Sequence, residues 1–149
     1  MKPISLEQLV SILKGKLPPV FQEFNVQFAY LGGSWARHQN APWSDIDIFA
    51  SWQGCESTTP KEFLARWTQL NVEAVAATNF DAIEITFLER VPLHVQFNVI
   101  SEGILLFEVS EDIRTRFIEH LLQEYPDHMI WFNNFLHQAM GKLLQEGGF

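Results

Sequence analysis

The chain has 149 residues, the length of one ordinary domain, and carries a formal charge of −8 with a pI near 5.0. This acidic balance argues against direct contact with nucleic acid, because proteins that bind the phosphate backbone generally present a basic face. It would also repel a nucleotide unless cations neutralised the charge locally, so it favours a divalent metal such as magnesium.

Cysteine content and hydropathy indicate the cellular compartment and the kinds of partner to expect. A single cysteine, Cys55, excludes an intrachain disulfide and a thiolate cluster, and we expect it to act as a small apolar side chain. No apolar run approaches the ~18 residues of a membrane span, and the N-terminus lacks a secretion signal. We therefore expect a cytoplasmic protein without membrane contact. Its 47% hydrophobic residues supply either a dense core or a protein interface within a homo- or hetero-oligomer.

Hydrophobic periodicity and turn residues divide the chain into alternating helices and strands. In chain order we expect a helix over 5–17, a strand over 26–31, a short helix over 34–38, a strand over 45–51, a helix that starts at Pro60, strands over 72–76 and 82–88, a helix over 92–99, a strand or extended link over 104–109, and helices after Ser110 and Asp127. Capping patterns support the first and third helices, because Ser5 is followed by Gln8 and Thr59 by Glu62. The order predicts an α/β (α+β) fold, a small mixed sheet flanked by helices, in one domain over 1–149.

Two aspartates on the second strand are the first candidate site residues. Asp45 and Asp47 are two residues apart, so both side chains point to the same face, while Ile46 and Ile48 face the core. Carboxylates this close can share a pair of metal ions of the kind that assists phosphoryl transfer.

A glycine turn precedes these acids by ten residues. Gly32 and Gly33 allow the main chain to approach a phosphate, and Ser34 adds a hydroxyl at a helix N-terminus. Arg37, one helical turn later, is placed to contact triphosphate oxygens. The turn and the acids together predict a site for a nucleoside triphosphate with metal.

We expect a third acid to complete the site. The best candidate is Glu84, which lies between Ile83 and Ile85 in an otherwise apolar run, so the alternation of side chains along a strand puts it on the opposite face from these isoleucines. A carboxylate on a buried strand is costly unless it is paired or binds metal, so Glu84 is expected to bridge a metal or accept a proton. By contrast, Asp81 and Glu89 are expected to be solvated acids.

The aromatic and histidine side chains near these motifs carry weaker signals. Trp35 and Trp43 either wall a base pocket or simply pack, and we expect packing. His38 and His94 lack metal-ligand spacing with another histidine or cysteine, so we expect surface or core positions for them.

Gly33-Ser34, the ten-residue gap and Asp45-Ile46-Asp47 resemble the signature of the DNA polymerase β-type nucleotidyltransferase superfamily. The size is similar to that of the minimal nucleotidyltransferases, the MntA-like antitoxins paired with HEPN-domain toxins. The resemblance covers residues 5–125, including Ile83-Glu84-Ile85 and residues 102–108.

The resemblance implies a nucleotidyltransferase fold with two Mg²⁺ ions held by Asp45, Asp47 and Glu84, and with nucleotide contacts from Gly33, Ser34 and Arg37. It further implies transfer of AMP from ATP to a tyrosine of a HEPN toxin, with release of pyrophosphate. The chain departs from the family pattern at Glu84, where aspartate is usual and where the extra methylene would alter metal geometry or rate. It also departs at His38, where glycine is frequent after the arginine.

A last helix over 127–146 is predicted to have a broad apolar face, with Ile130-Trp131-Phe132 continuous around it. Such a face either packs on the core or docks a partner or a second subunit.

Two other functions remain open at this point. One is nucleotidyl transfer to a small molecule, as in the enzymes that modify aminoglycosides, although little chain follows residue 110 to build an acceptor domain. The other is a weakly active binding module that neutralises its partner by occlusion.

Overall fold

The computed structural model describes residues 4–41, 44–124 and 137. The described strands form one mixed sheet in the order β3-β2-β1-β4. Their bounds are β1 (Phe28–Leu31), β2 (Ile46–Ser51), β3 (Ile83–Phe87) and β4 (Ile104–Glu108). β1 runs antiparallel to both β2 and β4, and β2 runs parallel to β3. The expected fold class, a small mixed sheet flanked by helices, is confirmed.

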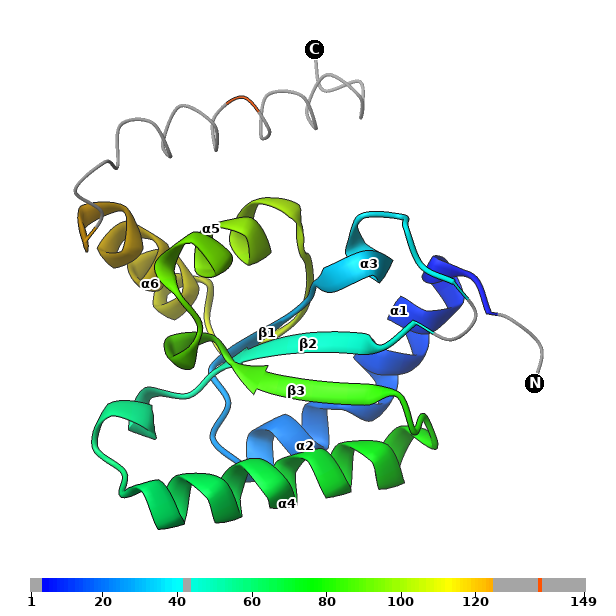
Figure 1. The fold of residues 1–149 in the computed structure, drawn as a ribbon, viewed down its shortest axis with the longest axis horizontal. Coiled ribbons are helices and arrows are strands. Elements are labelled where there is room, and N and C mark those ends of the chain that lie inside the picture. Colours follow the sequence, from blue (N-terminus) through cyan, green and yellow to red (C-terminus); the bar gives the residue numbers. More distant parts are fainter. Residues whose placement is uncertain (1–3, 42–43, 125–136, 138–149) are drawn as a thin grey trace.

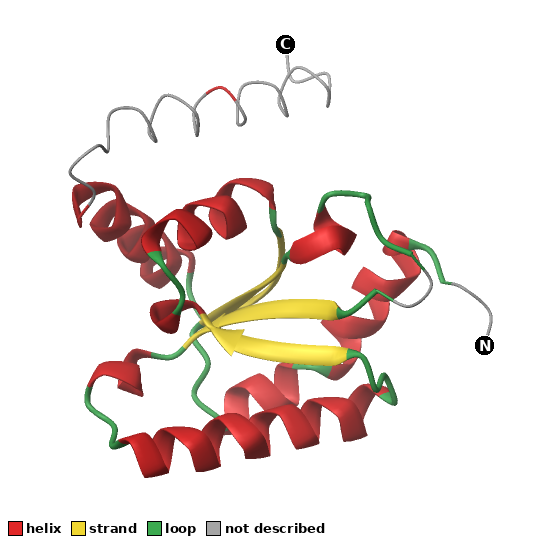
Figure 2. Ribbon diagram, viewed as in Figure 1, coloured by secondary structure: helices red, strands yellow, loops and turns green. Residues whose placement is uncertain are grey.

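Helices cover both faces of this sheet (Figures 1 and 2). They are α1 (Leu6–Lys16), α2 (Pro18–Glu23), α3 (Gly33–Ala36), α4 (Pro60–Thr78), α5 (Leu93–Glu102) and α6 (Glu111–Glu124), with 3₁₀ turns η1 (Gln53–Glu56) and η2 (Leu88–Arg90). α1, α2 and α4 lie on one face of the sheet, and α5 and α6 lie on the other. None of the described helices is long and apolar enough to cross a membrane.

Strand alternation separates the main core from the polar side of the sheet. Ile46, Ile48 and Ile85 are buried in the larger hydrophobic cluster, together with side chains of α1, α2 and α4. The alternate positions, Asp47 and Glu84, therefore point to the opposite face, as the sequence predicted.

The local signals at helix starts are confirmed. The Ser5 side chain accepts a hydrogen bond from the Gln8 backbone and the Gln8 side chain returns one, which completes a capping box. Thr59 likewise accepts from the Glu62 backbone at the start of α4. The extended segment after Gly103 is a strand, β4, which pairs with β1.

The expected strand over 72–76 is wrong, because α4 continues through it to Thr78. The buried positions Leu70, Ala74 and Thr78 are four residues apart, so one helical face stays against the sheet beyond the point where the β-branched side chain of Val72 suggested a strand. Asn79 then ends the helix in the left-handed conformation, with φ of 61°.

Two smaller differences concern proline and loop segments. Pro18 ends α1 as expected but also begins α2, because proline is favoured in the first turn of a helix. The segment between the strand expected over 45–51 and the helix expected from Pro60, for which no element was predicted, contains the 3₁₀ turn η1. Trp43 and the helix predicted over 127–146, His137 apart, lie outside the described residues.

Side chains of α4 complete the hydrogen bonding of the edge strand β3. The Asn71 amide oxygen accepts from Ile85 N at 2.7 Å, and its nitrogen donates to Ile85 O at 3.1 Å. Trp67 Nε1 also donates to Ile85 O, at 2.7 Å. These bonds satisfy backbone groups on the outer side of the strand that carries Glu84.

We expect Asn71→Leu to lower the free energy of unfolding by about 1–3 kcal/mol, because it leaves the part-buried N–H of Ile85 without a partner. Chemical denaturation measures the effect. Gln69→Leu, an exposed position on the same helix, is the control and should change stability by less than about 0.5 kcal/mol. Equal stability of the two variants would contradict the role of Asn71.

Candidate active site

The turn between β1 and α3 is built around two glycines. Gly33 has φ of +64°, the left-handed region that side-chain-bearing residues rarely adopt. The Gly32 N–H donates to the carbonyl of Asp47 at 2.8 Å, which ties the turn to β2. A Cβ atom built on Gly33 would lie 2.4 Å from Asp47 Oδ2. The Asp47 carboxylate therefore rests against bare main chain, in space that any other residue at position 33 would fill.

The sheet register brings the second acidic strand to the same place. In the parallel β2–β3 pair, Asp47 lies opposite Glu84. Asp47 is half-buried and Glu84 is exposed, while Asp45 is exposed just before β2. Glu84 alternates with the buried Ile83 and Ile85, as expected. The argument from a buried carboxylate is wrong, because the Glu84 side chain itself is exposed.

The pKa of Asp47 shows that the predicted residues act on one another. Burial raises the pKa of Asp47 above its usual value of 3.8, and the negative charges of Glu84 and Asp45 raise it further, while Arg37 lowers it. Asp45, Asp47, Glu84 and Arg37 thus share one electrostatic environment. A cation placed among the carboxylates would relieve their repulsion.

The donor chemistry suits a hard metal ion, although the side chains are not assembled around one. Carboxylate oxygens are the ligands that magnesium prefers. No three His, Cys, Asp or Glu side chains among the described residues are grouped so that they could hold a metal ion. The acids that the sequence predicted as ligands, Asp45, Asp47 and Glu84, are therefore not grouped around a metal position in this structure.

The remaining predicted residues lie on α3 and just after it. Ser34 is half-buried at the start of the helix, and Arg37 is exposed at its end. His38 adopts the left-handed conformation with φ of 58°, so this position needs the geometry that glycine favours, at a cost of about 1–2 kcal/mol for a histidine. Trp35 is buried, which confirms packing. His38 and His94 are exposed, as expected.

The known-protein comparisons agree with this geometry. The family model for polymerase beta nucleotidyltransferases matches residues 15–112, which span β1 to β4 and all six predicted site residues. The chain belongs to the polymerase beta nucleotidyltransferase family. No curated protein matches this nucleotidyltransferase at a significant level.

Solved structures show the same fold at low identity. One similar chain comes from a tri-AMPylated Shewanella oneidensis HEPN toxin in complex with MNT antitoxin, with 15% identity, a TM-score of 0.58, and coverage of 88% of this chain and 98% of that one. Another comes from a toxin-antitoxin crystal structure with AMP-PNP, with 16% identity, a TM-score of 0.52, and coverage of 91% and 93%. Both support the nucleotidyltransferase fold.

Asp81 and Glu89, which were both expected to be solvated, differ in the structure. Asp81 is exposed, as expected, but the expectation that Glu89 is a solvated acid is wrong. Glu89 is half-buried and accepts hydrogen bonds from Ser51 Oγ at 2.5 Å and from Trp52 N at 3.1 Å. Burial raises its pKa. Its partners are far away in sequence, so no local signal could have identified this position.

The single cysteine behaves as predicted. Cys55 is 2% exposed, and burial raises the pKa of its thiol to about 12. It is a packed apolar side chain and not a nucleophile.

We expect Asp47→Asn to raise the midpoint of thermal unfolding at pH 7 and to have little effect below pH 3.8. Because the folded pKa of Asp47 lies above the unfolded value, its contribution to stability is complete at low pH and is lost as the pH rises through the folded pKa. Asparagine does not ionise and escapes that loss. Scanning calorimetry at both pH values measures the difference.

The matched control for this pH test is Asp81→Asn, at an exposed aspartate outside the site. A gain in midpoint for Asp47→Asn that is the same at both pH values, or no gain at pH 7, would contradict the electrostatic account.

Proposed function

We propose that this nucleotidyltransferase transfers AMP from ATP to a hydroxyl group of a partner protein, and that the partner is a HEPN-type toxin which the added group silences. The observation that carries the proposal is the contact of Asp47 with the Gly33 turn, in register with Glu84. This contact places the turn proposed to bind phosphate next to the carboxylates carried by β2 and β3. Nucleotidyl transfer requires that combination of a phosphate site and metal-binding carboxylates.

In this proposal Asp45, Asp47 and Glu84 would hold two Mg²⁺ ions. When bound, magnesium supplies charge neutralisation of the triphosphate and of the leaving pyrophosphate. The Ser34 hydroxyl and the main chain of the turn bind phosphate oxygens, and Gly33 keeps that surface free of a side chain. Arg37, exposed beside the acids, contacts the same phosphates.

The proposed chemistry is an in-line displacement at the α-phosphorus. The acceptor hydroxyl oxygen forms a bond to this phosphorus, and the bond from it to the oxygen that bridges the α- and β-phosphates breaks. Pyrophosphate leaves with the electrons of that bond, and Arg37 stabilises its charge. Glu84, which is exposed on β3, accepts the hydroxyl proton.

The choice of acceptor is supported by two likenesses. The sequence resembles the MntA-like antitoxins, and the fold is similar to a chain from the complex that contains an AMPylated HEPN toxin. A tyrosine hydroxyl on the HEPN partner is accordingly the proposed acceptor, and the chain acts as an antitoxin in the cytoplasm. The helix predicted over 127–146 is the proposed docking element.

One observation favours a second candidate. The carboxylates are not grouped around a metal position, and the third is a glutamate on an exposed face. A chain with a slow site would neutralise its partner by occlusion alone.

The intact mass of the HEPN partner, incubated with this chain, ATP and magnesium, tests the proposal. We expect an increment of one or more AMP groups on tyrosine, which peptide fragmentation locates. Asp45→Asn/Asp47→Asn should slow the modification by at least ~100-fold, because the ligands and the charge complementarity are lost. Asp81→Asn, an exposed acid just before β3, is the control and should retain the rate.

Glu84→Ala and Glu84→Asp separate the two candidates. Loss of transfer in Glu84→Ala with retention in Glu84→Asp supports Glu84 as part of the machinery. Binding of the partner without any mass increment, unchanged in the double variant, would refute transfer and support occlusion.

A further inference from the structure

A cleft lies beside the glycine turn, between α3, β2 and α5. It extends from Gly33 and Arg37 over Phe49 to Asn98 and Glu102. Its volume is about 230 Å³, below the roughly 300–1,000 Å³ of pockets that enclose a whole small ligand. The cleft therefore suits one part of a ligand whose remainder lies in the open site next to it.

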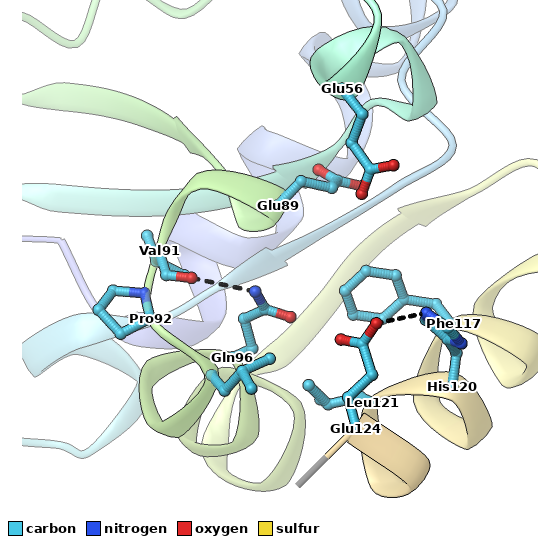
Figure 3. A pocket seen from close by; sticks show the side chains of 10 residues that line it. Glu56, Glu89, Val91, Pro92, Gln96, Phe117, His120, Leu121 and Glu124 are labelled. Atoms are coloured by element: carbon cyan, nitrogen blue, oxygen red, sulfur yellow. Dashed lines mark hydrogen bonds and ion pairs between the residues drawn. The ribbon is translucent and has the colours of Figure 1, made fainter.

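A larger cavity, of about 380 Å³, lies on another side of α5, between this helix, η2 and α6 (Figure 3). Figure 3 shows Glu56, Glu89 and Glu124 at its border. Its lining among the described residues includes no part of the glycine turn and no part of the acidic strands β2 and β3. The smaller cleft is therefore the one that adjoins the proposed nucleotide site.

The floor of this cleft is an aromatic ring that lies against the turn. Phe49 follows Asp47 by two residues on β2, so both side chains point to the same face of the sheet. A Cβ atom on Gly32 would lie 2.7 Å from Phe49 Cε2, which shows that the ring packs against bare main chain. The apolar floor of the cleft is therefore continuous with the turn proposed to bind phosphates.

The end of α5 fixes the order of the polar side chains along the cleft. A Cβ atom on Gly103, the residue after this helix, would lie 3.1 Å from the carbonyl oxygen of Leu31, the last residue of β1. Glu102 is therefore beside the turn. Asn98 lies four residues earlier in the helix, about 6 Å farther along the cleft. A molecule that extends from the turn along α5 meets a carboxylate first and an amide second.

The fold does not account for the charge of Glu102. This residue is in the last turn of α5, where the negative end of the helix dipole disfavours an acid. Its side chain is half-buried and forms no ion pair with any other residue that the structure describes. A carboxylate repels phosphate, but it accepts hydrogen bonds from ribose hydroxyls, as acidic residues do in dinucleotide-binding proteins.

We propose that this cleft holds the nucleoside of the triphosphate, and that Glu102 selects a ribonucleotide by binding the 2′ and 3′ hydroxyls. The inference rests on the proposed function, because the turn must first hold the phosphates. The order of turn, carboxylate and amide matches the order of phosphate, ribose and base in a nucleotide.

The base then lies over the Phe49 ring, with Val95 and Val99 beside it, and reaches Asn98. Asn98 is exposed, and its amide offers both a donor and an acceptor. Adenine presents an amino group next to a ring nitrogen, which an asparagine amide can bind with two hydrogen bonds. Asn98 therefore favours adenine over guanine.

Calorimetry of the full chain with magnesium, in the absence of an acceptor, tests the inference by binding alone. The first probes are ATP, 2′-deoxy-ATP and inorganic tripolyphosphate, which fills the turn without entering the cleft. We expect ATP to bind at least about tenfold more tightly than either of the others. The reason is that tripolyphosphate lacks the nucleoside, and the deoxynucleotide lacks one hydroxyl for Glu102.

Glu102→Gln should weaken ATP binding about fivefold or more and should reduce the preference for ATP over 2′-deoxy-ATP to about twofold. It should leave tripolyphosphate bound at least as tightly as in the wild type, because it removes a negative charge near the turn. The matched control is Glu119→Gln, which removes an exposed charge from α6 outside the cleft lining and should change none of these affinities.

Asn98→Ala should reduce the ratio of ATP affinity to GTP affinity at least about fivefold. His94→Ala, at an exposed position one helical turn earlier and outside the cleft lining, should keep the wild-type ratio.

Equal affinities of the wild type for ATP and tripolyphosphate would overturn the inference and leave the turn as a phosphate site. An undiminished preference for ATP over 2′-deoxy-ATP in Glu102→Gln would do the same for the role of Glu102. Absence of binding by both ATP and tripolyphosphate would instead refute the proposed function, and the inference with it.

Discussion

The contact between Asp47 and the main chain of Gly33 is the constraint on which the proposed site depends. The carboxylate occupies the space where a Cβ atom would be, and the Gly32 N–H fixes the same turn to the Asp47 carbonyl. The turn therefore cannot move away from β2 without breaking the hydrogen bond between Gly32 N and the Asp47 carbonyl. Because β2 is also in register with β3, this one contact places the turn, Asp47 and Glu84 as a unit. The rest of the fold serves to hold that unit in position.

The alternation of the strands explains how an acidic protein tolerates this cluster. Ile46, Ile48 and Ile85 pack against α1, α2 and α4 on one face of the sheet. This packing places Asp47 and Glu84 on the opposite face, although their negative charges repel each other there. Burial first, and then the negative charges of Glu84 and Asp45, raise the pKa of Asp47. Under the proposed function, a cation brought by the nucleotide would relieve the repulsion among these carboxylates.

Local and periodic signals were sufficient for the elements that position the site, and long-range contacts account for the failures. The caps at Ser5 and Thr59 and the parity of Glu84 follow from residues close in sequence. The segment over 72–76 was mistaken for a strand because its helical face is defined only by packing on the sheet. The burial of Glu89 depends on Ser51 and Trp52, which are 38 and 37 residues away. No spacing pattern encodes such a contact, so the burial of Glu89 could not be predicted.

Binding of ATP with magnesium to the wild type and to Gly33→Ala tests the central claim most directly. Alanine at this position would place a methyl group 2.4 Å from Asp47 Oδ2 at a φ of +64°, so we predict a loss of affinity of at least about tenfold in a variant that still folds. Gly15→Ala, where nothing lies within 4 Å of the added atom, should bind as the wild type does. Equal affinities of Gly33→Ala and the wild type would contradict the assignment of this turn as the nucleotide site.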